Sequence, residues 1–147
     1  MDLMRFILPT VLLLHVLARA SPSAAQQATT QVALLCSGEM YSFDKTPFSG
    51  AWRQADVDDL VMGTLDLEKS GFRGVYGYPW LPFTKVTDTG YWHTSQQTGS
   101  AWGVYNLEVG MDRRSGQLYA WVSRLGATTK HMLLLVHCRP DDRPRRF

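Results

Sequence analysis

The sequence predicts an all-β protein, a small antiparallel barrel or sandwich of about six to eight strands. Short segments in which apolar and polar residues alternate follow one another between Gly, Pro and Asp turns, and no window keeps the 3.6-residue period of a helix. The chain also contains two cysteines, Cys36 and Cys138, near the two ends of the part expected after export. Two lone cysteines in an exported protein pair as a disulfide, which requires Cα atoms within about 7 Å. The first and last strands are therefore predicted to be joined by this bond.

Residues 1–25 are predicted to be a signal peptide. Arg5 supplies a positive start, residues 6–17 are largely apolar, and small residues follow at positions 18–20 and 23–25. We expect cleavage after Ala25, with Ala20 as the alternative, and hence a periplasmic or secreted protein. The apolar stretch is shorter than the roughly 20 residues that span a bilayer, and no later segment is longer. No transmembrane segment is therefore expected in the mature chain.

Residues 26–147 have the length of one domain with its own core. The formal net charge of the whole chain is only +2, which gives no reason to expect nucleic acid or an anionic surface as a partner. The last residues are rich in Arg and Asp and are broken by Pro140 and Pro144. We expect residues 139–147 to form an exposed tail of a single β domain.

Each predicted strand rests on its local pattern. Residues 32–41 begin with an apolar run that is typical of a buried strand. In residues 57–68 a period of two places Val61, Leu65 and Leu67 on one face, predicted to be buried, and Asp66 on the other. A helical turn or two within residues 55–62 is the alternative for the start of that segment.

The remaining segments follow in the same way. Residues 42–52 and 95–100 read as loops, and Gly and Pro at high density in residues 71–83 indicate an irregular edge or loop. The other predicted strands are residues 91–94, 101–111, 117–123 and 131–138.

Residues 112–116, Asp-Arg-Arg-Ser-Gly, predict a hairpin turn. The Asp112 carboxylate can accept hydrogen bonds from the amides just beyond it, and Gly116 tolerates the positive φ of the following bulge. A catalytic role for Asp112 would need a second acid or base close by. We therefore expect Asp112 to be structural.

This turn has the form G-x-x-D-R-x-S/T-G and is followed by a leucine-rich last strand, a C-R/K-P sequence and an R-x-F-like end. The matching residues are Gly110, Asp112, Arg113, Ser115, Gly116, Cys138, Arg139, Pro140, Arg146 and Phe147, and the early Cys36, Ser37 and Gly38 also fit. The combination resembles a group of small secreted proteins from alphaproteobacteria, rhizobia among them. The resemblance covers the C-terminal part and the first strand, and it implies a fold and an exported compartment but no activity. The aromatic residues between 72 and 102 depart from the pattern of the group.

No catalytic or metal site is predicted. His131 and His137 would stand roughly 20 Å apart on one strand, too far to share a metal, and with His93 they are expected at the surface or at strand ends. Residues 56–59, Asp-Val-Asp-Asp, lack the glycine and the distal glutamate of a calcium loop, so a solvated loop is expected. The chain also has no G-x-S-x-G elbow, P-loop or dinucleotide fingerprint. We expect a protein that is not an enzyme and needs no cofactor.

Aromatic residues in the middle of the chain are the candidates for a binding site. Tyr76, Tyr78, Trp80 and Trp92 could line a ligand groove, with ring faces that supply apolar area and polar edges that orient the ligand. The alternative is that these rings fill the core and cap the ends of a barrel. The triplet Gly-Ala-Trp that ends at Trp52 is similar to the G-x-W of lipocalin-like barrels, although here a full strand precedes it.

The sequence thus predicts a non-catalytic exported protein of the bacterial envelope, with a binding or structural accessory role. A small-molecule-binding, lipocalin-like barrel and a periplasmic protein inhibitor are the alternatives. The partner is expected to be a protein or a small molecule in the periplasm, and its identity stays open.

Overall fold

The computed structural model describes residues 30–99 and 101–142. The predicted signal peptide and residues 143–147 of the predicted tail lie outside this part. The elements are β1 (Gln31–Phe43), β2 (Trp52–Asp66), β3 (Gly71–Arg73), the 3₁₀ turn η1 (Val75–Gly77), β4 (Leu81–Pro82), β5 (Lys85–Thr87), β6 (Gly90–Gly99), β7 (Gly103–Asp112), β8 (Gln117–Arg124) and β9 (His131–Pro140).

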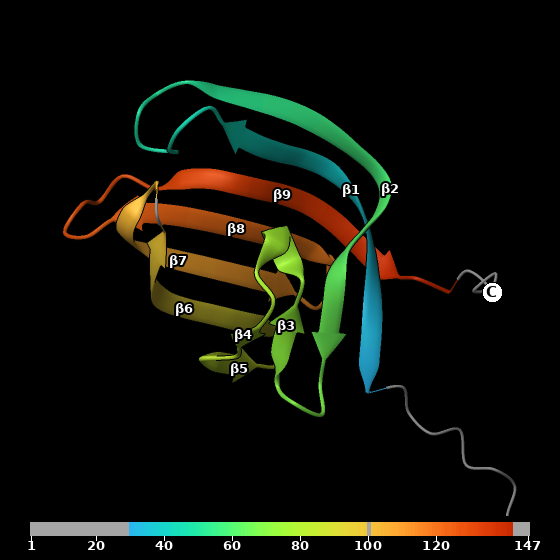
Figure 1. Cartoon of the computed structure of the whole chain (residues 1–147). Helices are drawn as coiled ribbons and strands as arrows, with labels where there is room; N and C mark the ends of the chain where they lie inside the picture. The colour runs from blue at the N-terminus through green and yellow to red at the C-terminus, as the bar shows by residue number, and fades with distance from the viewer. Residues whose placement is uncertain (1–29, 100, 143–147) are drawn as a thin grey trace, which may run out of the picture.

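The strands form one antiparallel sheet in the order β4-β3-β2-β1-β9-β8-β7-β6-β5. The sheet curls into a half-barrel (Figure 1), so the predicted all-β, barrel-like architecture is confirmed. The predicted count of six to eight strands is too low, because the described residues contain nine. The excess comes from β3, β4 and β5, which have only two or three residues each and lie in and just after the segment predicted to be irregular. Strands that short carry almost no periodicity.

The two edges of the sheet are joined by the chain itself. Edge strands β4 and β5 are consecutive and are separated only by Phe83 and Thr84. The Phe83 amide donates to the Ser70 carbonyl beside β3, and the Thr84 amide donates to the Trp92 carbonyl in β6, each at 2.8 Å. Phe83 and Thr84 thus connect β3 to β6 across the opening between the two edges of the sheet.

His93 holds the same junction from inside. It is 3% exposed, and its Nδ1 lies 2.6 Å from the Pro82 carbonyl oxygen while Nε2 lies 2.7 Å from the Ser95 hydroxyl. Because a carbonyl oxygen can only accept, Nδ1 donates to Pro82, and Nε2 shares a hydrogen bond with the Ser95 hydroxyl. The expectation of a surface position was wrong for this histidine. Burial is tolerated because both ring nitrogens have partners.

The predicted disulfide between Cys36 and Cys138 is confirmed. The two residues lie directly opposite each other in β1 and β9, with Cα atoms 4.0 Å apart. The bond therefore joins the first and the last strand along the chain, which are neighbours in the sheet. β9 continues through Pro140, so the first two residues of the predicted tail, Arg139 and Pro140, pair with β1 while their side chains remain exposed.

Two bulges in β2 change which of its side chains face the core. β2 has one extra residue opposite β1 near Asp59, whose φ is 46°, and a second one at Met62. Met62 and Asp66 are buried, whereas Val61 and Leu67 are 47% and 40% exposed. The predicted burial of Leu65 is confirmed. The prediction for Val61 was wrong because an extra residue reverses the alternation beyond it. Leu67 is exposed because β2 ends at Asp66 and Leu67 lies in the turn that follows.

Side chains hold β2 at its end and at its first bulge. Buried Asp66 accepts hydrogen bonds from Gln31 Nε2, the Lys69 amide and Arg73 Nη2 at 3.2, 2.9 and 3.3 Å. Asp59 accepts from Arg139 at 3.2 Å. Residues 56–59 are therefore part of a bulged strand, not the solvated loop or helical turn that their sequence suggested.

Two further predicted strands, residues 101–111 and 91–94, correspond to β7 and β6. In β7, the alternate residues Tyr105, Leu107 and Val109 are buried. β6 runs on to Gly99, so residues 95–99 are strand and not loop. In the described part of the chain no helix is long or hydrophobic enough for a membrane span.

The β7–β8 hairpin has the predicted turn. Asp112 Oδ1 accepts hydrogen bonds from the amides of Arg114 and Ser115 and from the Ser115 hydroxyl, at 2.9, 2.7 and 2.9 Å. Hydrogen bonds from Ser115 lower the pKa of the Asp112 carboxyl from its ordinary value. Asp112 thus stabilises the turn, as expected from the sequence.

Gly116→Val is expected to lower the free energy of unfolding by about 1–3 kcal/mol. Gly116 has φ 71°, and an added Cβ would overlap the Cys138 carbonyl. The turn is also hydrogen-bonded to β9, because the Cys138 amide donates to the Gly116 carbonyl at 2.8 Å. Urea unfolding measures the loss. Gly126→Val is the control, because Gly126 has a similar φ of 74° with open space around it. Equal losses in the two variants would show that the close approach to β9 contributes nothing.

Candidate binding surface

The structure separates the four predicted ligand-binding residues. Tyr76 and Tyr78 lie together at one end of the half-barrel, where they line a hollow of about 260 Å³ with Gly99, Ala101, Trp102 and Tyr105. The hydroxyls of Tyr78 and Tyr105 are 2.8 Å apart. Burial is the larger cause, and the hydrogen bond to Tyr105 the smaller one, of a raised pKa of the Tyr78 hydroxyl. The hydroxyl therefore stays protonated at neutral pH.

Trp80 and Trp92 lie elsewhere. Trp80 packs against the Gly71 backbone, where no side chain would fit, and the Arg73 guanidinium lies 5.7 Å from its ring centre. Trp92 extends from β6 on the face opposite to the core. The two tryptophans therefore do not share a site with Tyr76 and Tyr78.

The outer face of the sheet carries an unexpected group of aromatic side chains. In β8, Leu118, Ala120 and Val122 are buried, so the alternation of the strand turns Tyr119 and Trp121 outward. Together with other outward rings they form a group that we call the aromatic band: Trp92, Tyr119, Trp121, Tyr41 and Trp52.

Contacts between neighbours connect the band. Trp92 Nε1 donates to the Tyr119 hydroxyl at 3.0 Å, and the ring centres of Tyr119 and Trp121 are 6.5 Å apart. Tyr41 and Trp52 have ring centres 5.5 Å apart. Trp121 links the two groups because it lines one hollow, of about 350 Å³, together with Tyr41 and Trp52. The band thus extends across strands that are far apart in the sequence.

Gly110 allows Tyr119 to lie flat on the sheet. Gly110 stands between Trp92 and Tyr119 in the cross-strand row, and a Cβ on it would overlap the Tyr119 ring. Burial raises the pKa of the Tyr119 hydroxyl, so this residue presents a neutral, partly covered ring. The absence of a side chain at Gly110 gives the band its flat centre.

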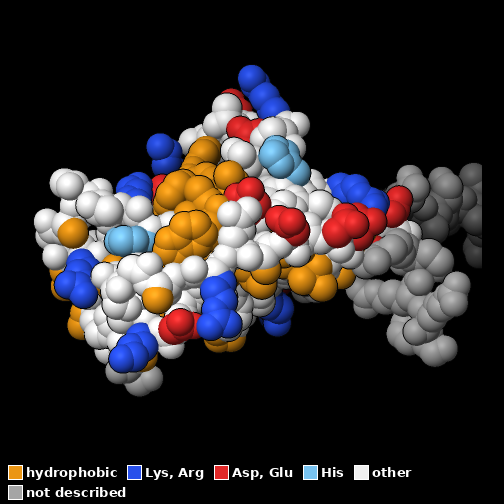
Figure 2. All heavy atoms as spheres, turned by 90° about the horizontal axis from the view of Figure 1, so that it is seen from above, with side chains coloured by type: hydrophobic (Ala, Val, Ile, Leu, Met, Phe, Trp, Pro, Cys, Tyr) orange, Lys and Arg blue, Asp and Glu red, His pale blue; other side chains and the backbone are white. Residues whose placement is uncertain are grey.

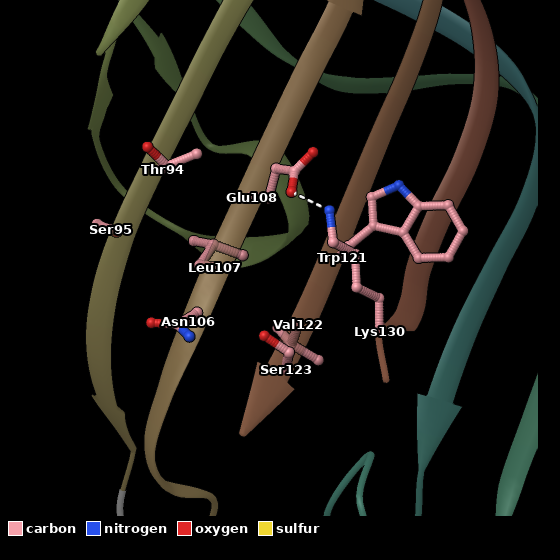
Figure 3. Close-up of a pocket in the computed structure, with 9 residues that line it drawn as sticks. All are labelled: Thr94, Ser95, Asn106, Leu107, Glu108, Trp121, Val122, Ser123 and Lys130. Carbon is pink, nitrogen blue, oxygen red and sulfur yellow. Dashed lines mark hydrogen bonds and ion pairs between the residues drawn. The ribbon is translucent and has the colours of Figure 1, made fainter. Parts of the chain in front are cut away.

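A second hollow, of about 290 Å³, adjoins Trp121 on the side of β6 and β7 (Figure 3). Its side chains come from three strands and from the residue before β9; the lining residues are Thr94, Ser95, Asn106, Leu107, Glu108, Trp121, Val122, Ser123 and Lys130. Figure 3 shows the Lys130 side chain passing beside the Trp121 ring to reach Glu108 on β7. The Trp121 ring is seen face-on in this view. Trp121 and Lys130 line both hollows and so join them into one surface.

Two ion pairs lie at this surface or next to it. Lys130 Nζ lies 2.5 Å from Glu108 Oε2, and Arg53, next to Trp52, lies 3.1 Å from Asp44. Figure 2 shows hydrophobic side chains gathered on the face seen from above, with Lys, Arg, Asp and Glu side chains around them. Because each of the two ion pairs contains one cation and one anion, the pairs add no net charge to the surface.

Sequence reasoning included Trp92 but missed Trp121, Tyr41, Glu108 and Lys130. The outward direction of Trp121 is encoded in the alternation of residues 117–123, which is visible in the sequence. Its neighbours depend on the register of β6, β7, β8 and β9, which the sequence does not show. Trp52, noted for its similarity to a lipocalin motif, is 58% exposed.

Comparison of the chain with protein-family models, curated proteins and solved structures found no match.

Proposed function

We propose that this chain is a non-catalytic exported binding protein of the bacterial envelope and that the aromatic band is its binding surface. The observation that carries the proposal is that Trp121 joins two hollows on the outer face, with polar groups from three strands beside it. Rings in the core of a domain are explained by packing, whereas a connected set of partly exposed rings on a sheet surface is typical of an interaction site.

The core supports this assignment because it does not need these rings. Its largest fully buried side chains are those of Phe72 and a set of Leu and Val residues. No residue of the band is among the buried residues of the core cluster. The proposed compartment rests on the predicted signal peptide, and the disulfide is typical of an oxidising compartment.

Trp121→Ala is expected to reduce binding of the protein to envelope fragments at least tenfold, because the residue contacts both halves of the surface. The measurement is co-sedimentation of purified protein with a washed envelope fraction from the bacterium that makes it. The variant should keep its free energy of unfolding within about 1 kcal/mol, since the ring lies outside the core.

Val104→Ala serves as the matched control, because Val104 is an apolar side chain that is 46% exposed at the start of β7 and outside the band. It should co-sediment like the unchanged protein. Undiminished co-sedimentation of a folded Trp121→Ala variant would contradict the proposal.

A second candidate function, binding of a small molecule, is favoured by the hollow near Tyr78. The hydroxyls of Tyr78 and Tyr105 share one hydrogen bond, which uses only one of their two protons. The other proton is available to an acceptor in the hollow, and Trp102 and Tyr76 supply ring area around it. Native mass spectrometry of protein purified from its own periplasm would detect such a ligand.

A further inference from the structure

We infer that the ligand of the aromatic band is an uncharged polysaccharide chain that lies across the strands. This inference rests on the proposed function, because it assigns a ligand class to the same surface. Three properties of the band lead to it: its length, the chemistry around its rings and its charge.

The band is long. It extends from Trp92 in β6 to Trp52 in β2, and these strands are separated in the sheet by β7, β8, β9 and β1. Neighbouring strands are roughly 4.8 Å apart, so the band spans about 24 Å along the sheet. A compact small molecule would occupy one of the two hollows, whereas an extended chain can contact Trp92, Trp121 and Trp52 together.

The groups beside the rings match those of a sugar. A pyranose ring has an apolar face of C–H groups and a rim of hydroxyl groups. The C–H groups carry a small positive charge and are attracted to the negative face of an aromatic ring. Around Trp121, the Asn106 amide both donates and accepts, and the hydroxyls of Thr94 and Ser123 do the same. Glu108 adds acceptors and Lys130 adds donors. A stacked ring surrounded by such groups can hold a hydroxyl-rich chain at its face and its edge.

The charges favour a neutral ligand. In the described part of the chain, the Lys and Arg side chains recorded against the band or next to it are Lys85 over Trp92, Lys130 beside Trp121, and Arg53. The His131 ring also lines the hollow that Trp121 shares with Trp52. The acidic groups are Glu39, which accepts from the Tyr41 hydroxyl, Glu108 and Asp44. Three cations and three anions leave no net attraction for a polyanion.

The test uses the unchanged protein and chemically treated envelope fractions. One portion of the fraction is oxidised with periodate, which cleaves the vicinal diols of sugars, and another is digested with protease; both are then washed before co-sedimentation. We expect binding to fall at least tenfold after periodate and to stay unchanged after protease. Loss of binding after protease alone would identify a protein partner and overturn the inference while leaving the band as a binding surface.

A second measurement uses native gels that contain a soluble polysaccharide, with α- and β-linked glucans, a mannan and a galactan as neutral probes and alginate as the anionic probe. We expect retardation by at least one neutral polymer that persists in 0.5 M salt, because surface charge attraction is screened there. Trp121→Ala and Trp52→Ala should weaken the retardation at least tenfold, and Val104→Ala should leave it unchanged.

Retardation by alginate only, or by none of the polymers, would overturn the inference. The proposed function fails separately, through undiminished binding of Trp121→Ala to the untreated envelope fraction.

Discussion

Replacing Cys36 and Cys138 together with alanine is expected to lower the free energy of unfolding by about 4–5 kcal/mol in the chain-entropy model, with a smaller loss in practice. The bond closes a loop of 102 residues between β1 and β9, so its removal frees nearly the whole domain in the unfolded state. Because a small domain has only about 5–15 kcal/mol of stability in total, the variant should unfold at a much lower urea concentration. Alanine is chosen because Cys36 is buried and an added hydroxyl would lack a partner.

The reduced, unchanged protein is the control for this variant. Adding a reductant should lower its stability by a similar amount and should leave the double alanine variant unaffected. Thiol labelling of denatured but unreduced protein should modify neither cysteine. Modification of both cysteines under those conditions would contradict the bond.

Phe72→Ala should cost about 3–5 kcal/mol, the range for removal of a fully buried phenylalanine. Phe72 is 0% exposed and its ring meets Phe83 edge-on with centres 5.0 Å apart, while Phe83 stacks on Tyr91 at 4.9 Å. The three rings connect β3, the β4–β5 link and β6. The alanine variant therefore loses packing at the place where Phe83 and Thr84 link the two edges of the sheet.

Urea unfolding measures this effect, and Val86→Ala is the control at the same junction. Val86 lies in edge strand β5 and is 52% exposed, so its truncation should change stability by less than about 0.5 kcal/mol. If Phe72→Ala were as mild as Val86→Ala, the junction would not depend on this packing.

Local patterns predicted most of the strands and failed at identifiable places. Residues 32–41 and 117–123 were recognisable because alternation or an apolar run persists through them. Val61 was misread because a bulge in β2 reverses the faces, and a bulge has no periodic signal. Leu67 was misread because the strand ends one residue before it. The buried His93 was also missed, since its carbonyl partner at Pro82 lies across the sheet junction.

The candidate site was predicted only in part for a similar reason. Tyr76 and Tyr78 are close in sequence and remain together in the structure. Trp80 and Trp92 were grouped with them because the four residues follow one another along the chain. The curl of the sheet places Trp80 beside Gly71 and places Trp92 on the outer face.

By itself, the sequence determined the fold class, the hairpin turn at Asp112 and the pairing of Cys36 with Cys138. Each depends on local alternation, on turn chemistry within five residues or on the presence of only two cysteines. Only the tertiary structure decided that Trp92, Trp121 and Trp52 share one surface, because they lie on three strands of one curled sheet, with Tyr119 linking Trp92 to Trp121 and one hollow linking Trp121 to Trp52. Register is set by the packing of the whole sheet and by its bulges, and no local segment contains that information.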